Sequence, residues 1–255
     1  MVDEKKKLLP PDQAIEVILQ DKRLKKIEYH EGIWQARFEM DEKFKIANDS
    51  PYMPTFWLDY PVDGLANASI FLGVIRMICS NGVKAISRGF RTEIEVNDNY
   101  GTHLSKLLSS YSNDIRINSL RHRLEGAHRT KASVYELQQV CSLLTSNVND
   151  KTKLRALLTR LEELAGDPCF IYQVTSLKNI GPKKAKLLPV ECSVNELFIF
   201  CSELITHHSS LITSADAFNS LLGNMLSQEF DLEDMYPIRK SAPAFTLNKM
   251  EALCV

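Results

Sequence analysis

Basic and titratable side chains crowd together near the middle of the chain, at Arg116, Arg121, His122, Arg123, His128, Arg129 and Lys131. Within this stretch only Glu125 opposes them. Arg and Lys neutralise the phosphates of nucleic acid and release bound counterions. Because the stretch has no apolar periodicity, we expect a basic loop that contacts a phosphate backbone. The alternative is a solvated connection whose charges meet the acidic end of the chain or another subunit.

The charge excess extends beyond this stretch. Residues 76–131 contain ten Lys or Arg against five Asp or Glu, although the whole chain has a net charge of −1. We therefore add Lys84, Arg88 and Arg91 to the expected phosphate contacts.

Aromatic residues are concentrated before the basic stretch. Eleven of the 21 in the chain fall between Tyr29 and Tyr100. Single-strand binders stack bases on exposed aromatic rings beside a basic groove, which makes Trp34 and Trp57 candidate stacking residues. Ordinary core packing of a sheet explains the same enrichment.

A second phosphate-binding pattern occurs later in the chain. Residues 177–188 are similar to the hairpin of a helix-hairpin-helix, in which Gly181, Lys183 and Lys184 would contact a phosphate and Pro182 would begin a helix. Pro189 shortens that helix, and residues 169–174 are strand-like where another helix is required. A lysine-rich loop with a short exposed helix is the alternative.

Catalytic and metal-binding patterns are lacking. No His-Glu-x-x-His, Gly-x-Ser-x-Gly, phosphate-loop or dinucleotide glycine motif occurs. His207 and His208 are adjacent on a predicted helix and diverge by about 100°. The acidic residues from Glu229 to Asp234 are typical of a solvated tail. We expect no catalytic residue, metal or cofactor, and we rank a metal-dependent nuclease below the binding functions.

These residues require elements to position them, and the patterns predict an α+β fold. An aromatic-rich antiparallel sheet is expected within residues 27–97, and helices within residues 103–227. We expect one domain over residues 1–230, followed by an acidic, Pro-containing tail over residues 231–255. No internal repeat or low-complexity block is apparent.

Local signals define the elements more closely. Glu31-Gly32 predicts a hairpin, residues 44–46 a third strand, and Asn81-Gly82 a type I′ turn between two further strands. Residues 92–96 extend the second arm of that hairpin. An amphipathic helix opens the chain near Pro11, a Leu-rich helix ends at Gly166, and Ser193 begins a late helix with a capping box.

Composition excludes several classes of protein. The chain has 255 residues, 44% of them hydrophobic and 25% charged, as in globular domains. Six Cys with no Cys-x-x-Cys spacing indicate buried reduced thiols, which predicts a cytoplasmic location. No apolar run reaches the length of about 20 residues that spans a bilayer, so we expect no membrane partner.

Two segments together resemble the phage/plasmid-like family of proteins of unknown function. Residues 74–83 are similar to an apolar strand of that family ending in Cys79-Ser80-Asn81-Gly82, and residues 194–208 to its late helix ending in Thr206-His207. The resemblance implies a protein of a phage or other mobile element, located in the host cytoplasm. It implies no catalytic residue.

The sequence thus predicts a non-enzymatic nucleic-acid-binding protein. Single-stranded DNA is the favoured partner, in replication, annealing or recombination, and a homo-oligomer is expected. The alternative is a phage structural or host-interacting assembly protein that acts through protein-protein contacts.

Overall fold

The computed structural model describes residues 11–47, 51–62, 66–77, 82–84, 90–94, 100–111, 114–166 and 182–227. The chain forms two compact units, Met1–Arg121 and His122–Val255. The sequence changes composition near residue 100, about twenty residues before this division. Together the elements confirm the α+β class.

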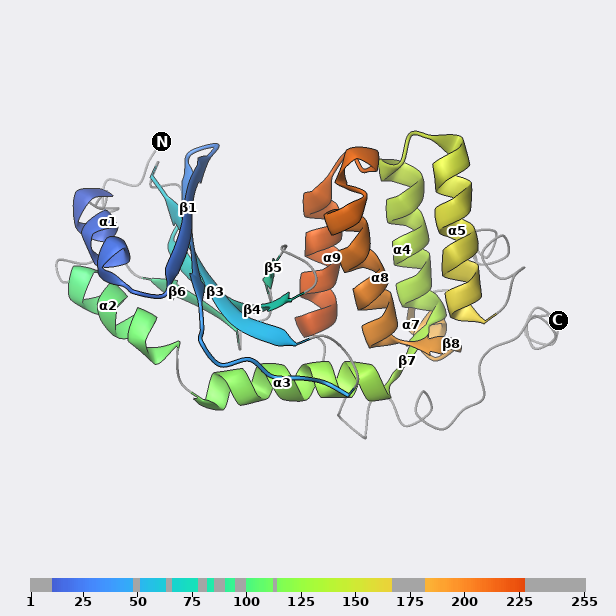
Figure 1. Ribbon diagram of the computed structural model, residues 1–255, viewed down its shortest axis with the longest axis horizontal. Helices are drawn as coiled ribbons and strands as arrows, with labels where there is room; N and C mark the ends of the chain where they lie inside the picture. The colour runs from blue at the N-terminus through green and yellow to red at the C-terminus, as the bar shows by residue number, and fades with distance from the viewer. Residues whose placement is uncertain are drawn as a thin grey trace. The chain divides into compact units, whose positions relative to one another are not determined.

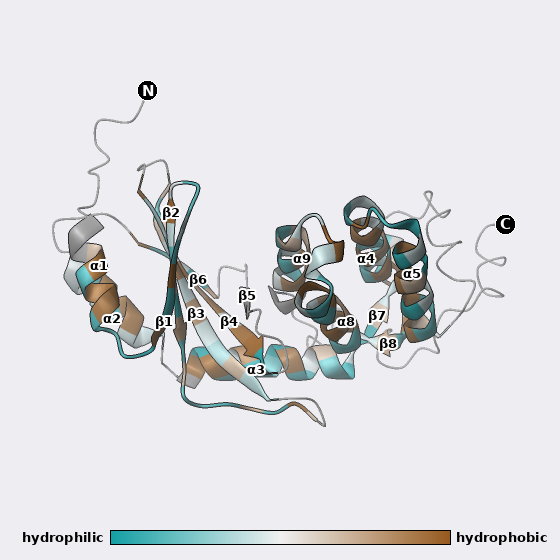
Figure 2. Ribbon diagram, turned by 45° about the horizontal axis from the view of Figure 1, so that its top comes forward, coloured by the Kyte–Doolittle hydropathy of each residue, from teal (hydrophilic) through white to brown (hydrophobic). Residues whose placement is uncertain are grey.

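The first unit is a sheet with two helices. It contains α1 (Pro11–Gln20), β1 (Leu24–His30), β2 (Ile33–Glu39), β3 (Tyr52–Pro61), β4 (Ala68–Arg76), β5 (Gly82–Lys84), β6 (Arg91–Ile94) and α2 (Tyr100–Ser110). Strands β1 to β4 form an antiparallel meander, and β5 and β6 both pair with β4 (Figure 1). Edge strand β1 is largely hydrophilic and β4 largely hydrophobic, as their positions in the sheet require (Figure 2).

The hairpin between β1 and β2 is confirmed. Glu31 has φ 48° and Gly32 has φ 83°, so both turn residues are left-handed, as a type I′ turn demands. This turn sets the register that pairs His30 with Ile33 and Tyr29 with Trp34.

Two other strand predictions are wrong in detail. Gly82 belongs to β5 and pairs with Ile75, so it is not part of a two-residue turn with Asn81, which lies outside the described residues. The strand expected at residues 44–46 is a single bridge, in which Phe44 and Tyr52 exchange backbone hydrogen bonds of 2.9 and 2.7 Å. The strand expected at residues 92–96 is observed as β6, and it does extend the same side of β4.

One face of the sheet forms the core of the first unit with α2. Phe38 and Phe56 stack with ring centroids 4.6 Å apart, and the Tyr111 ring lies 5.9 Å from that of Phe56. The Tyr111 hydroxyl donates to the carbonyl of Ile70 at 3.1 Å. Helix α1 contacts α2, and its Ala14 and Ile18 are buried, whereas Leu19 is exposed.

The second unit consists of helices on a two-stranded ribbon. It contains β7 (Lys131–Ser133), α4 (Val134–Asn147), α5 (Lys151–Ala165), α7 (Pro182–Ala185), β8 (Pro189–Ser193), α8 (Val194–His207), η1 (Ser209–Leu211) and α9 (Ala215–Ser227). Strands β7 and β8 pair antiparallel. Helices α9, α8, α4 and α5 lie side by side in that order (Figure 1). Helix α3 (Asp114–Arg129) contains the division between the units.

The second unit is internally repeated, which the sequence prediction missed. Residues 133–144 and 193–204 are identical at seven of twelve positions, sharing Ser-Val-x-Glu-Leu-x-x-x-Cys-Ser-x-Leu. Each copy runs from a ribbon strand directly into a helix that begins with a Ser-Glu capping box.

The hydrogen bonds of the two copies also correspond. The Val134 N–H donates to the Leu188 carbonyl, and the Val194 N–H to the Thr130 carbonyl, each at 2.9 Å. Beyond the repeated helices, Val148 and Ile212 form an antiparallel bridge. The second unit therefore consists of two strand-helix-helix halves. They pair with each other in the β7–β8 ribbon and at the Val148–Ile212 bridge.

The end of α5 confirms the predicted stop signal. Gly166 has φ 83°, and its N–H donates to the carbonyls of Glu162 and Glu163. Asp150 caps the other end by accepting from the N–H groups of Thr152 and Lys153. Within the part of the chain that the structure describes, no helix has the length and apolarity to cross a bilayer.

Candidate nucleic-acid interface

The basic stretch is a helix and not the predicted loop. Residues from Asp114 to Arg129 form α3, and Lys131 opens β7. A helix divides its side chains between faces, so the cations of this stretch cannot all reach one ligand.

Two of the predicted phosphate contacts are turned toward the protein. Arg116 and Arg123 are seven positions apart and so share one face of α3, together with the buried Leu120 and Leu124. The Arg116 guanidinium lies 4.5 Å from the centroid of the Tyr111 ring and donates to Thr92 Oγ1 at 3.3 Å. Arg123 is half-buried. Arg116 therefore packs within the first unit.

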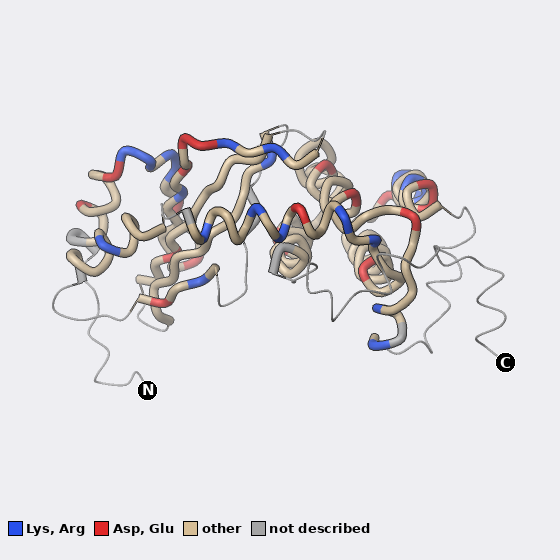
Figure 3. Tube along the Cα trace, turned by 90° about the horizontal axis from the view of Figure 1, so that it is seen from below, with Lys and Arg blue, Asp and Glu red and all other residues tan. Residues whose placement is uncertain are grey.

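The opposite face of α3 is exposed and basic. It carries Arg121, His122, His128 and Arg129, all exposed, with the half-buried Glu125 as its one acidic group among the described side chains. Lys and Arg positions recur along the whole helix (Figure 3). His128 and Arg129 also lie in the last turn, where cations interact favourably with the helix dipole. We refer to Arg121, His122, His128 and Arg129 as the exposed basic face.

The remaining predicted cations are engaged elsewhere or lie outside the description. Lys131 is 3.7 Å from Glu191 on the paired strand. Arg91 forms an ion pair with Glu93 at 3.0 Å and its guanidinium lies 5.4 Å from the Phe71 ring centroid. Lys84 lies in β5 opposite Gly73, and Arg88 is outside the described residues.

Trp57 does not offer the exposed ring that base stacking requires. Its side chain retains 8% exposure, on a central strand between Arg37 of β2 and Phe71 of β4. The prediction of Trp57 as a surface platform is therefore wrong, and core packing is the better account of this residue.

Trp34 belongs to an aromatic pair that the sequence prediction missed. The half-buried Trp34 ring lies 5.1 Å from that of Tyr29, its partner across the hairpin, and Tyr29 is 56% exposed. The Glu31-Gly32 turn contains the signal, because a two-residue turn fixes Tyr29 opposite Trp34. This pair has the exposed ring surface that Trp57 lacks.

The predicted phosphate-binding hairpin is described only in part. Pro182–Ala185 is a single helical turn, Lys183 is exposed, and Lys184 lies in the same turn. Gly181 is outside the described residues. Lys186 follows the turn, and its Nζ lies 4.8 Å from the Tyr135 ring centroid, so this lysine forms a cation–π contact within the second unit.

The cysteines that the structure describes are buried thiols, as predicted. Burial raises the pKa of Cys141, Cys192 and Cys201 to about 12 in each case. Nearby Glu162 adds to the shift at Cys141, and Cys141 adds to that at Cys201. Among the described residues, no three His, Cys, Asp or Glu side chains gather closely enough to hold a metal.

Comparisons with protein-family models, with curated proteins and with solved structures found no match to this chain. The geometry of its own residues therefore carries the functional argument.

Proposed function

We propose that this chain is a non-enzymatic nucleic-acid-binding protein of a phage or mobile element that binds single-stranded DNA during replication, annealing or recombination. The observation that carries the proposal is the exposed basic face of α3, where Arg121 and Arg129 stand two helical turns apart and Glu125 is the one carboxylate among the described side chains of the helix. Arg side chains on an exposed helix face neutralise phosphates of a nucleic-acid backbone.

The Tyr29–Trp34 pair supports the preference for single strands. An exposed aromatic ring gains stacking energy from an unpaired base, whereas the bases of a duplex are already stacked. The mobile-element context rests on the sequence resemblance alone.

Binding of labelled DNA of about 30 nucleotides, followed by fluorescence anisotropy at several salt concentrations, tests the proposal. Replacing Arg121 and Arg129 together with Ala should lower the affinity and reduce the salt slope by about 1.4 for a single strand. The matched control replaces Lys151 and Arg155, two exposed cations of α5, and should leave the slope near its original value.

Two results would overturn the assignment. Absence of DNA binding at low salt removes the function itself. Equal losses of DNA affinity in the two double variants would show that binding depends on the general positive charge of the protein. They would exclude a specific role for α3. Tyr29→Leu adds a separate test, since it should weaken binding of single-stranded DNA and leave binding of duplex DNA unchanged.

One observation favours protein assembly as a second candidate. Lys131 and Arg91 already have carboxylate partners within the chain, at 3.7 and 3.0 Å, so part of the predicted basic set is neutralised by the fold itself. A protein that acts through protein-protein contacts needs no phosphate-binding cations, and would keep its assembly state after nuclease treatment.

A further inference from the structure

The free edge of the first sheet has a charge pattern that is complementary to itself. In the part of the chain that the structure describes, β1 pairs with β2 alone and so forms one edge of the sheet (Figure 1). An edge strand presents backbone N–H and C=O groups that a further strand can pair with. Strand β1 is seven residues long, with a register irregularity between Leu24 and Lys26, and its pairing with β2 is regular from Lys26 to His30.

The side chains of β1 define which strand would fit. Lys26 and Glu28 lie on the same face of the strand, on either side of Ile27, and their side chains are 52% and 55% exposed. Within the chain they already form an ion pair of 2.6 Å. A partner strand with the opposite order of charges would give each of them a second counterion.

A second copy of β1 supplies that order in one register. When two identical strands pair antiparallel about Ile27, Lys26 of each copy faces Glu28 of the other. Pairing about Lys26 places two ammonium groups opposite each other, and pairing about Glu28 places two carboxylates opposite each other. Only the register centred on Ile27 keeps corresponding faces together and makes every central charge pair attractive.

We propose that two copies of this protein associate through their β1 strands, antiparallel and centred on Ile27, to form one continuous sheet. Each Lys26 then lies between two carboxylates, the Glu28 of its own strand and the Glu28 of the other copy. Each Glu28 likewise lies between two Lys26 ammonium groups. Lysines alone on an edge would repel a second copy and protect the sheet from pairing. Glu28 changes that outcome, because it turns repulsion into attraction in this one register.

Charge reversal tests the proposal on the full chain. Lys26→Glu and Glu28→Lys should each weaken the dimer, measured by sedimentation equilibrium, by about tenfold or more, because each change makes two symmetry-related pairs repulsive. The variant that carries both reversals should restore the dimer to within about threefold of the original affinity. Lys151→Glu on α5 gives the same change in net charge as Lys26→Glu and should leave the dimer unchanged.

Folding of each variant is checked by the fluorescence of Trp34 and Trp57, which both lie in the first unit. A protein that stays monomeric at every concentration overturns the proposal. So does a dimer that tolerates both single reversals, or one that Lys151→Glu weakens equally. The dimer is measured without DNA, so its failure is distinct from a failure of DNA binding.

Discussion

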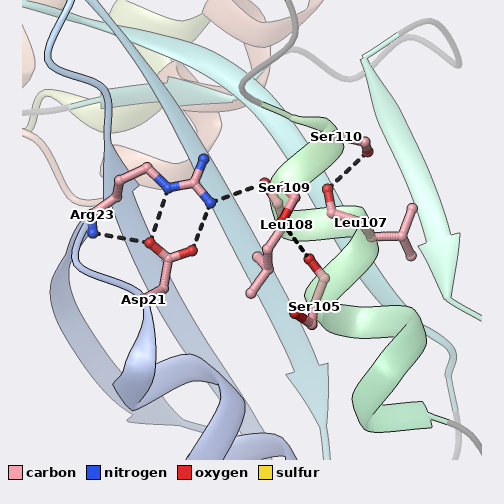
Figure 4. Close-up of polar contacts among 7 residues, drawn as sticks. All are labelled: Asp21, Arg23, Ser105, Leu107, Leu108, Ser109 and Ser110. Carbon is pink, nitrogen blue, oxygen red and sulfur yellow. Dashed lines mark hydrogen bonds and ion pairs between the residues drawn. The ribbon is translucent and has the colours of Figure 1, made fainter.

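Arg23 and Asp21 form a two-pronged ion pair at the junction between α1 and β1. Arg23 Nη2 donates to Asp21 Oδ2 at 2.6 Å and Nε donates to Oδ1 at 2.9 Å (Figure 4). The same Nη2 donates to the carbonyl of Leu108 in α2 at 3.0 Å, and the guanidinium lies 4.9 Å from the Phe56 ring centroid. One side chain therefore joins the start of the sheet to the helix that covers it.

Removing this link should destabilise the first unit. Arg23→Ala deletes a charge-assisted pair whose side chains are 22% and 13% exposed, and we expect a loss of about 2 kcal/mol in the free energy of unfolding. Denaturant titration followed by tryptophan fluorescence measures it, since both tryptophans lie in this unit. Lys43→Ala, which removes an exposed cation of the same unit, is the control. Equal losses in the two variants would contradict the role of Arg23.

The same pair predicts a pH dependence. Burial alone would raise the pKa of Asp21, but the hydrogen bonds from the Arg23 side chain and N–H and the positive charge of Arg23 outweigh it, so the pKa lies below its ordinary value of 3.8. A lowered pKa in the folded state stabilises the fold above pH 3.8, and this contribution is lost as the pH falls through the folded value. Acid titration of Asp21→Asn should show a smaller loss of stability below pH 4 than the unchanged protein. Identical acid unfolding curves would contradict the prediction.

Local signals explain what could be predicted of the fold. The turn at Glu31-Gly32, the capping box at Ser193 and the stop at Gly166 each depend on a few adjacent residues, and each is observed. The sequence predicts the strand that follows Asn81 but not the position of the turn before it. The reason is that the register of β5 is set by its pairing with β4, where Gly82 lies opposite Ile75.

Helix α3 shows why the candidate site was predicted less well. Its buried face includes Leu120, Leu124 and Ala127, and the alkyl parts of Arg116 and Arg123 occupy positions where hydrophobic residues would have revealed the helical period. The burial of Trp57 depends on contacts distant in sequence, which no local pattern reports. The pairing of Tyr29 with Trp34, in contrast, follows from the hairpin register alone.

Alanine substitutions at two glycines test the backbone conformation at each position. A Cβ at Gly166 would lie 2.3 Å from Cγ and 2.8 Å from Cβ of Glu191, at a φ of +83°. Gly166→Ala should therefore cost about 1 to 2 kcal/mol, because it adds backbone strain and displaces Glu191. Gly101→Ala meets only Val17 Cγ2 at 3.8 Å and should be neutral or stabilise α2 by about 0.5 kcal/mol. Urea unfolding followed by circular dichroism compares them, and a reversed order would contradict the assigned conformations.

The repeated halves allow one interaction to be tested in two environments. Glu136 accepts from the Ser133 N–H at 2.8 Å and is fully buried, whereas Glu196 accepts from the Ser193 N–H at 2.7 Å and is exposed. Losing Glu136 leaves buried donors unsatisfied, and losing Glu196 leaves donors that water reaches. We expect Glu136→Ala to cost about 2 kcal/mol and Glu196→Ala about 1 kcal/mol. Equal costs would show that burial does not distinguish the two caps.

Burial of three thiols predicts that they react slowly with disulfide reagents and that the fold loses stability at alkaline pH. Burial raises the pKa of Cys141, Cys192 and Cys201 to about 12, so the thiolate that reacts with disulfide reagents is scarce in the folded protein near pH 8. A raised pKa in the folded state stabilises the fold below the ordinary value of 9.0, and this contribution is lost as the pH rises toward 12. At pH 8, at least three of the six thiols should therefore stay unreactive toward a chromogenic disulfide until denaturant is added. Cys141→Ala should lower the number of slow thiols by one, whereas rapid reaction of all six in the folded protein would contradict the burial of these side chains.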